Sequence, residues 1–535
     1  MMWERQHLKG SSLLMGLALL VLAFAFSLLL RSNPWSQVLP GHDSSMFIYM
    51  GREWVQGGVP YLSFTDHKGP SIMLVNALGW LLPHVQRFGG IWWVEVASLF
   101  FYALWGFKTL RLFLDRSKSF LVVVLSFLLL AWLLSGGNIT EIYALPMIMG
   151  ALCLYFSYFK RGYLRFSEYF FLGLGGAFTF NLRANMIVSW LPLLGFFFVA
   201  WLYYKDWSAL KQGLFGIFMG IFAYVLPWVA YLAYEGALGE MLYFSITFNW
   251  LYVSAGHVNR WAVFLDWLAT PFGKRSVMCL LLGLTGGVFS FLTQPEKPRH
   301  FYISLGFFLS LALTFFSTFL SGRLYAHYFI PLVPYLLVLL GDFLRPFEGR
   351  PWAWLINCGL WAGALYFCWP QGQVLYNELY LINADTPVPQ LVAGARNSQP
   401  KQDNYPSRQL EKRALKLRLQ VANNEKIGRL MNQKNRPEDT IYVHRRGGAL
   451  YLMRNYHAPG RYFNLPAMDL RQDRSLNEEF IKSFQAHPPK LLIFEDKFLK
   501  DASKDGPLEQ FLRQESKTHY KKLQKIGPEV VFEHL

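Results

Sequence analysis

The 535-residue chain is 53% hydrophobic and 18% aromatic, whereas only 16% of its residues are charged. Soluble domains carry about 25% charged residues, so this composition excludes a disordered chain, a fibrous chain and an ordinary soluble enzyme. Lysine and arginine outnumber aspartate and glutamate by 51 to 34, which gives a formal net charge of +17. In a polytopic membrane protein such an excess divides between cytoplasmic loops and polar domains, and we do not expect nucleic acid as a partner.

Apolar segments in chain order predict an α-helical membrane protein with about eleven transmembrane helices. The first segment follows Arg5 and Lys9 and lacks a small-residue cleavage site, so we interpret it as an uncleaved anchor with a cytoplasmic N-terminus. The expected spans, judged against a hydrocarbon core of ~30 Å, are Ser12–Leu30, Gly90–Leu112, Phe120–Leu134, Ile142–Phe159, Tyr169–Leu182, Met186–Tyr204, Gly213–Tyr234, Ser276–Leu292, Phe301–Leu320, Tyr328–Leu340 and Trp352–Trp369.

The orientation depends on Ser71–Val85, an apolar stretch that is too short for a confident span. If it does not cross, every short basic loop is cytoplasmic, as the positive-inside rule requires. If it crosses, the cytoplasmic side receives Ser135–Glu141, which contains no lysine or arginine. We therefore expect an interfacial helix within a long first external loop, residues 31–89. Glu235–Arg275 is then a second external loop, and the chain after Pro370 is also outside.

The C-terminal part differs in character, so we divide the chain into a transmembrane domain, residues 1–370, and an extracytoplasmic α/β domain, residues 371–535. Its excess of basic residues favours an anionic lipid or polymer surface, or equally a plain solvated surface. The elements expected there are a linker at Asn377–Asn404, a basic helix at Arg408–Met431, strands at Thr440–His444, Ala449–Met453 and Lys490–Phe494, and a helix near Leu476–Gln485.

Cofactor signals are missing from the sequence. The four cysteines, Cys153, Cys279, Cys358 and Cys368, all lie within or at the end of apolar segments, and no CxxC or HxxxH spacing occurs. There is also no P-loop and no strand-turn-helix GxGxxG fingerprint. We therefore expect no metal and no resident cofactor, although a divalent ion is not ruled out.

The most informative polar residues lie in the first external loop. Asp43 follows an apolar span and opens a helix-like segment, Ser44–Gln56, so its structural interpretation is a helix N-cap. Asp66, His67 and Lys68 place an acid, an imidazole and an ammonium beside a Gly-Pro turn. Their structural interpretation is an exposed polar turn.

In their order along the chain and in the side of the membrane on which they are expected, these motifs resemble those of the bacterial GT-C membrane glycosyltransferases. These are the family 39-like relatives of protein O-mannosyltransferases and of the lipid A aminoarabinose transferase. That family carries an acid shortly after its first helix and a Lys-Pro or Lys-Gly-Pro motif about 20–25 residues later. Asp43 is followed by Ser44 and not by a second acid, which puts a two-acid metal site in doubt. Further matching segments are Asn138–Glu141, Arg183–Asn185, Arg323–Phe329, Tyr442–Phe463 and Pro488–Lys490.

The resemblance implies a multi-pass protein of the bacterial plasma membrane that transfers a sugar from a polyprenyl-phosphate donor to an extracytoplasmic acceptor with inversion. Asp43 would be the general base, and Glu141 would position the acceptor or share that role. Lys68, Arg183 and Arg323 would hold the phosphate. The supporting residues would be Asp66 and His67 beside Lys68, and Tyr325 and His327 at the phosphate.

Structural interpretations of the same residues stay open. Glu141 could be an acid at a helix N-terminus, Arg183 and Arg323 could be snorkelling interfacial anchors, and Tyr325 with His327 could belong to an aromatic belt. Three functions compete with the transferase: a transporter or flippase of lipid-linked sugars, a non-catalytic scaffold, and a polysaccharide ligase or polymerase. We see no paired half-sequences of the kind common in transporters.

Overall fold

The computed structural model describes residues 2–254, 260–270, 298–320, 325–345, 405–444, 447–464, 474–502 and 506–535, apart from gaps at 37, 85–87, 132, 135, 435 and 437–438, together with a few isolated residues between 273 and 362. Arg323 lies outside the described residues. The expected spans Ser276–Leu292 and Trp352–Trp369 and the linker Asn377–Asn404 also lie outside them, apart from isolated positions.

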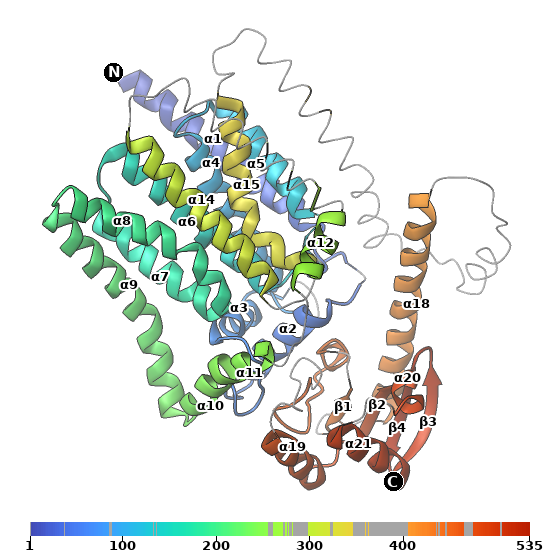
Figure 1. The fold of residues 1–535 in the computed structure, drawn as a ribbon. Coiled ribbons are helices and arrows are strands. Elements are labelled where there is room, and N and C mark those ends of the chain that lie inside the picture. Colours follow the sequence, from blue (N-terminus) through green and yellow to red (C-terminus); the bar gives the residue numbers. More distant parts are fainter. Residues whose placement is uncertain are drawn as a thin grey trace.

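A bundle of helices forms the larger part of the protein (Figure 1). Nine of the expected spans coincide with helical segments of this bundle. Its main helices are α1 (Met2–Ser27), α4 (Ile91–Leu110), α5 (Arg116–Ala131), α6 (Thr140–Arg161), α7 (Phe166–Leu182), α8 (Leu191–Tyr203), α9 (Trp207–Tyr234), α14 (Pro298–Phe319) and α15 (Val333–Leu344).

Shorter helices cover one end of this bundle. They are α2 (His42–Val55), α3 (Pro70–Leu81), α10 (Leu238–Leu242), α11 (Phe248–Ser254) and α12 (Arg260–Ala269). The expected helix at Ser71–Val85 is therefore present as α3, which begins at Pro70, the favoured residue for a first helical position.

Four helical segments of the described chain are long and apolar enough to cross a membrane: Thr140–Arg161, Ala184–Tyr203, Trp207–Tyr234 and Ala326–Leu344. On α8 and α9 large apolar side chains such as Phe198, Phe215, Phe218 and Phe222 stay exposed, as expected of a face in contact with lipid. The count of about eleven spans remains a prediction.

Two of these segments begin as 3-10 turns. The turn η1 (Ala184–Ser189) precedes α8, and η3 (Ala326–Leu332) precedes α15. Both lie against α14, where the Ser310 hydroxyl donates to the main-chain oxygen of Ser189 and pairs with the Tyr335 hydroxyl. The Ser310 hydroxyl therefore satisfies one main-chain oxygen of η1 and also joins α14 to α15.

The C-terminal part contains a four-stranded sheet of order β1-β2-β4-β3, formed by β1 (Ile441–Val443), β2 (Leu491–Glu495), β3 (Tyr520–Ile526) and β4 (Glu529–His534). β1 and β2 are parallel, whereas β4 runs antiparallel to both β2 and β3. The helices of this part are α18 (Tyr405–Lys434), α19 (Arg474–Ala486), α20 (Asp496–Lys500) and α21 (Pro507–Thr518).

The strand predicted at Ala449–Met453 is wrong, because residues Tyr451–Met453 form a 3-10 turn, η5. Tyr451 is fully buried, and its hydroxyl accepts from the main-chain N–H of Val443 in β1, so the apolar character of this segment reflects packing against the sheet.

The sequence did not predict the β3–β4 hairpin. The exposed face of β3 carries lysines, which weakens the alternation of apolar and polar residues by which a strand is recognised.

The two parts are arranged end to end. The sheet lies at the end of the bundle that carries α2 and α3, far from the start of α1 (Figure 1). The turns after α4 and α6 meet each other, since the Lys160 ammonium donates to the main-chain oxygen of Leu112. This arrangement gives the bundle one end with basic turns and another end covered by α2, α3 and the sheet.

Candidate active site

Asp43 lies in the first turn of α2, whose N-cap is Gly41. The N-cap interpretation of Asp43 is therefore wrong, and its side chain is not used to cap the helix. It is partly buried, whereas the following residues Ser44 to Arg52 are all buried. The helix dipole stabilises the negative charge of a carboxylate at this position. Because the Asp43 carboxylate makes no capping hydrogen bond, its oxygens can still accept a proton.

The surroundings of Asp43 favour its charged form. Burial raises the pKa of its carboxyl, but the nearby Lys68 ammonium, followed by His42, His327 and His67, outweighs that cost and lowers the pKa below its ordinary value. Within the described residues no hydrogen bond or ion pair of the Asp43 carboxylate occurs. The group is therefore ionised at neutral pH and available to accept a proton.

Asp66, His67 and Lys68 form a compact buried turn and not an exposed one. The carboxylate of Asp66 is fully buried, and its Oδ1 lies 3.1 Å from His67 Nδ1 and 3.5 Å from Lys68 Nζ. The same oxygen accepts the main-chain N–H of Lys68 at 3.0 Å. Asp66 thus contacts both of its neighbours in this turn.

The positive charge of this turn is carried by Lys68. Burial lowers the pKa of its ammonium, but Asp66 and Asp43 overcome this and raise the pKa above the ordinary value. Burial lowers the pKa of His67 to about 4 despite the neighbouring Asp66. At neutral pH the turn therefore presents a cationic lysine and a neutral imidazole.

Gly69 brings this turn against the end of α7. A Cβ at Gly69 would lie 2.3 Å from the main-chain oxygen of Asn181, so only glycine allows this approach. Asn181 stands two residues before Arg183. The glycine of the Lys-Gly-Pro motif therefore sets how closely the two cation-bearing segments meet.

Glu141 and Arg183 form a buried ion pair. Arg183 Nη1 lies 2.6 Å from Glu141 Oε1, and the Thr140 hydroxyl donates to Oε2 at 2.9 Å. The guanidinium also lies 3.7 Å from the ring centroid of Tyr328 in η3. Arg183 is thus held by α6 and η3 together, and not as a snorkelling anchor at a lipid interface.

His327 lies within electrostatic range of both Asp43 and Glu141. Its ring stacks on Tyr325, with centroids 5.6 Å apart, and meets Tyr328 edge-on. The Tyr325 ring is exposed, with 45% of its surface accessible. The structure therefore brings Asp43, Lys68, Glu141, Arg183 and His327 to one place.

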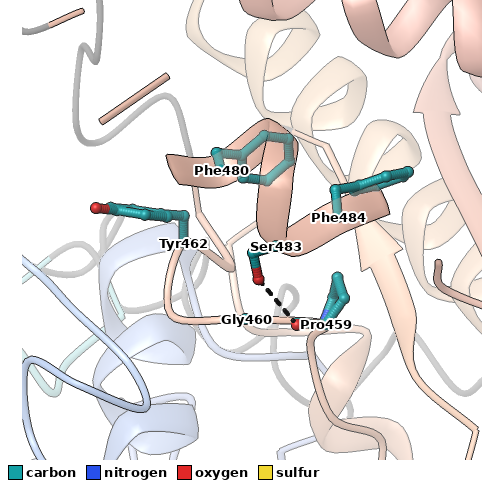
Figure 2. Close-up of a pocket in the computed structure, with 6 residues that line it drawn as sticks. All are labelled: Pro459, Gly460, Tyr462, Phe480, Ser483 and Phe484. Atoms are coloured by element: carbon teal, nitrogen blue, oxygen red, sulfur yellow. Dashed lines mark hydrogen bonds between the residues drawn. The ribbon is translucent and has the colours of Figure 1, made fainter. Parts of the chain in front are cut away.

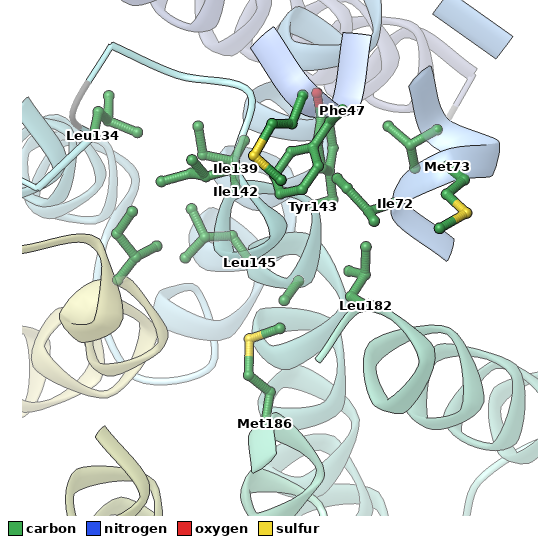
Figure 3. Packing of buried hydrophobic residues seen from close by; sticks show 14 of the residues in the cluster. Phe47, Ile72, Met73, Leu134, Ile139, Ile142, Tyr143, Leu145, Leu182 and Met186 are labelled. Carbon is green, nitrogen blue, oxygen red and sulfur yellow. The ribbon is translucent and has the colours of Figure 1, made fainter. Parts of the chain in front are cut away.

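An apolar cluster underlies this place (Figure 3). Phe47 and Ile72 come from α2 and α3, Ile142 from α6, Leu182 from α7 and Met186 from η1, and all are at most 3% exposed. Phe47 also supports the cation, since Lys68 Nζ lies 4.8 Å from its ring centroid. Asp43, Lys68, Glu141 and Arg183 each stand within four positions of one of these residues, so the packing helps to fix where those four side chains lie.

The segment 447–464 of the C-terminal part packs directly on α2. A Cβ at Gly448 would lie 2.1 Å from the Ser45 main-chain oxygen, and the Gly448 N–H donates to the Ser45 hydroxyl at 3.0 Å. The guanidinium of Arg52 donates to the main-chain oxygens of Tyr451, Arg454 and Tyr456. The 447–464 segment of the C-terminal part therefore packs against α2, the helix that carries Asp43.

Arg461 lies in the matching segment Tyr442–Phe463, but the sequence predicted no role for it; in the structure it joins three parts of the chain. Its guanidinium donates to Tyr61 O in the first loop at 3.0 Å, to Glu240 in α10 at 2.7 Å and to Glu479 in α19. Such long-range pairs have no local sequence signal.

A small pocket lies next to Arg461. It is lined by Pro459, Gly460, Tyr462, Phe480, Ser483 and Phe484 (Figure 2). Its volume of about 10 Å³ suits one water molecule and no sugar.

Metal ligation has little support in the described part of the chain, where no group of three or more His, Cys, Asp or Glu side chains could hold an ion. The expectation that no metal is needed stays a prediction.

This fold is that of the GT-C membrane glycosyltransferases, as the motifs indicated. The chain resembles ArnT from Cupriavidus metallidurans bound to undecaprenyl phosphate, with a TM-score of 0.58, 14% identity and 98% of each chain covered. The apo state of the same protein gives 0.56 at 13% identity, covering 99% of this chain and 98% of the other. The Archaeoglobus fulgidus oligosaccharyltransferase in its apo form gives 0.50 at 12% identity, covering 90% of this chain and 69% of the other.

Sequence comparison identifies the family. Residues 4–348 match the family model described as "Putative competence-induced protein Ccs4 N-terminal domain". Because the match spans more than half of the chain, this protein belongs to that family. A comparison with curated proteins gives no significant match.

Proposed function

We propose that this protein transfers a sugar from a polyprenyl-phosphate donor to an extracytoplasmic acceptor, with inversion at the anomeric carbon. The observation that carries the proposal is that a carboxylate without an ion pair among the described residues, Asp43, lies within electrostatic range of the ammonium of Lys68. A displacement of this kind needs a proton acceptor on one side of the sugar and fixed positive charge on the other.

Asp43 acts as the base in this proposal. The acceptor hydroxyl attacks the anomeric carbon, its proton passes to the Asp43 carboxylate, and the bond between that carbon and the phosphate oxygen breaks. Lys68 lowers the pKa of Asp43 in the donor-free protein. A bound phosphate offsets the charge of Lys68, which raises the basicity of Asp43 only when the donor is present.

Lys68 and Arg183 hold the phosphate, whose negative charge grows as the bond breaks. Each cation already has a carboxylate partner, Asp66 and Glu141 respectively. An ammonium has three N–H donors and a guanidinium has five, so each keeps donors free for phosphate oxygens. Glu141 then serves to position Arg183 and the acceptor side of the site, while Asp43 alone is free to act as the base. Arg323, Tyr325 and His327 stay candidates for further phosphate contacts.

We further propose that the site faces outward, with the N-terminus in the cytoplasm and the C-terminal part outside the plasma membrane. The turns rich in lysine and arginine lie at the far end from α2, as the positive-inside rule requires of a cytoplasmic side. Similar structures include ArnT bound to undecaprenyl phosphate, which supports a lipid phosphate as the donor carrier.

Purified protein reconstituted in liposomes with a radiolabelled polyprenyl-phosphate sugar tests the proposal. Release of polyprenyl phosphate on addition of envelope acceptors, lost in Asp43→Asn and kept in Asp115→Asn, supports transfer. Asp115 is a suitable control because it caps α5 in a basic turn at the other end of the bundle. Movement of intact sugar lipid across the bilayer without cleavage would instead identify a transporter and refute the proposal.

A further inference from the structure

A fully buried carboxyl group, Glu95 in α4, binds two segments that flank the site. The Ser32 hydroxyl donates to its Oε2, and the main-chain N–H of Asn138 donates to its Oε1. Burying a carboxyl group is costly unless hydrogen bonds satisfy it. Glu95 therefore holds the backbone of Asn138 in place at the turn between α5 and α6.

The side chain of Asn138 then connects three further elements. Its Nδ2 donates to the Ser44 main-chain oxygen at 3.2 Å and to Asn76 Oδ1 at 3.0 Å. Its Oδ1 accepts the Tyr143 hydroxyl at 2.7 Å. Both halves of the amide are engaged, and the side chain is fully buried.

The backbone at this point suits asparagine. Asn138 has a φ of +46°, a left-handed conformation that asparagine tolerates better than most residues. Gly137 before it has a φ of +92°, and a Cβ there would lie 2.6 Å from Glu95 Oε1. We name the set Glu95, Asn138, Asn76 and Tyr143 the Asn138 node.

The node lies between the two carboxylates of the site. Ser44, which Asn138 contacts, directly follows Asp43, and Glu141 stands three residues after Asn138 at the start of α6. We propose that Asn138 is a positioning residue that sets the separation of Asp43 from the Glu141–Arg183 pair. This inference rests on the proposed transferase function, because the separation matters for a sugar held between base and cation.

Substitutions in the Asn138 node are expected to lower kcat, because they change the separation of the groups on either side of the sugar. A misplacement of about 1 Å between reacting groups can lower a rate by roughly 100-fold. Asn138→Gly keeps the left-handed backbone and its N–H to Glu95 but removes all three side-chain contacts. Tyr143→Phe removes one of them. Tyr102→Phe is the matched control, since Tyr102 is an equally buried tyrosine of α4 and none of the described hydrogen bonds of the node involves it.

Steady-state kinetics with a polyprenyl-phosphate sugar, alongside melting temperatures, test the inference. We expect Asn138→Gly to lower kcat by about 10- to 100-fold while the KM for the donor changes less than about threefold, and Tyr143→Phe to show a smaller loss of the same kind. Tyr102→Phe should keep the wild-type kcat. A kcat of Asn138→Gly within about twofold of wild type, or a loss equally present in Tyr102→Phe, would overturn the inference.

A structural measurement separates this inference from the proposed function. If the wild-type protein cleaves no lipid-linked sugar, the transferase proposal fails by itself. Cryo-EM structures of wild type and Asn138→Gly then report the distance between the carboxyl carbons of Asp43 and Glu141. A change of about 1 Å or more supports the positioning role, and an unchanged distance refutes it.

Discussion

Arg183 lies 2.6 Å from Glu141, so the cation proposed to receive the phosphate is already paired before any donor arrives. The neighbouring Lys68 is arranged in the same way, with Asp66 at 3.5 Å. Paired cations can stay charged at buried positions without the full cost of desolvation. Asp43, by contrast, has no such pair within the described residues, and this difference supports the proposal that Asp43, and not Glu141, is the base.

Glu141→Gln tests the structural side of that assignment. Removing the charge of Glu141 leaves the buried guanidinium of Arg183 without its counter-ion, so we expect the donor-free protein to lose up to about 3 kcal/mol of stability. Polyprenyl phosphate supplies the missing negative charge, and it should therefore raise the melting temperature of this variant more than that of wild type. Equal shifts in both proteins would show that the phosphate does not reach Arg183.

Lys68→Met tests the coupling between cation and base. In the donor-free protein Lys68 is the strongest influence that lowers the pKa of Asp43. Activity that depends on ionised Asp43 is complete above this pKa and is lost as the pH falls through it. Removal of the ammonium raises the pKa of Asp43, so the acid limb of kcat/KM should move to higher pH. A pH profile with an unmoved acid limb would contradict the coupling.

His67→Gln tests the neutral imidazole. The pKa of His67 is lowered to about 4 by burial, so between pH 6.5 and 4 the unfolded chain binds a proton that the folded protein does not. Stability therefore falls in this window by about 1.4 kcal/mol per pH unit for this group. The variant should lose less melting temperature than wild type between pH 7 and pH 4.5, and an identical loss would refute the assignment.

Gly69→Ala tests the close approach of the two cation-bearing segments. The added methyl group would meet the main-chain oxygen of Asn181 at 2.3 Å, so the Lys68 turn must move away from Arg183. We expect the KM for the donor to rise about tenfold, equivalent to about 1.4 kcal/mol of lost phosphate binding. Gly195→Ala in α8 is the control, because a Cβ there meets nothing within 4 Å. Equal kinetics in both variants would count against the phosphate contact.

Much of the bundle could be predicted because spans are long apolar segments, and α4, α6 and α7 begin and end within three residues of expectation. The break η1 had no local signal, since the hydroxyl that satisfies its Ser189 oxygen comes from Ser310 in α14, 121 positions away. For the same reason the ion pair of Glu141 with Arg183 had no local signal, although both residues were identified singly.

The C-terminal part was harder to read. Its strand at Ile441–Val443 is short but fully buried and was recognisable, whereas β3 presents lysines on its exposed face. The contacts of Arg52 with Tyr451 and of Arg461 with Glu240 join residues that are more than 200 positions apart. Sequence periodicity carries no information on such pairs, so the packing of segment 447–464 on α2, beside Asp43, could be seen only in the structure.

In the proposed mechanism Asp43 accepts the proton of the acceptor while Lys68 and Arg183 hold the phosphate. The most direct measurement compares single-turnover release of polyprenyl phosphate by wild type, Asp43→Asn and Asp115→Asn, each with donor binding measured in parallel. We predict that Asp43→Asn binds the donor but releases polyprenyl phosphate at least about 100-fold more slowly, with Asp115→Asn unaffected. Wild-type rates of release in Asp43→Asn would contradict the account.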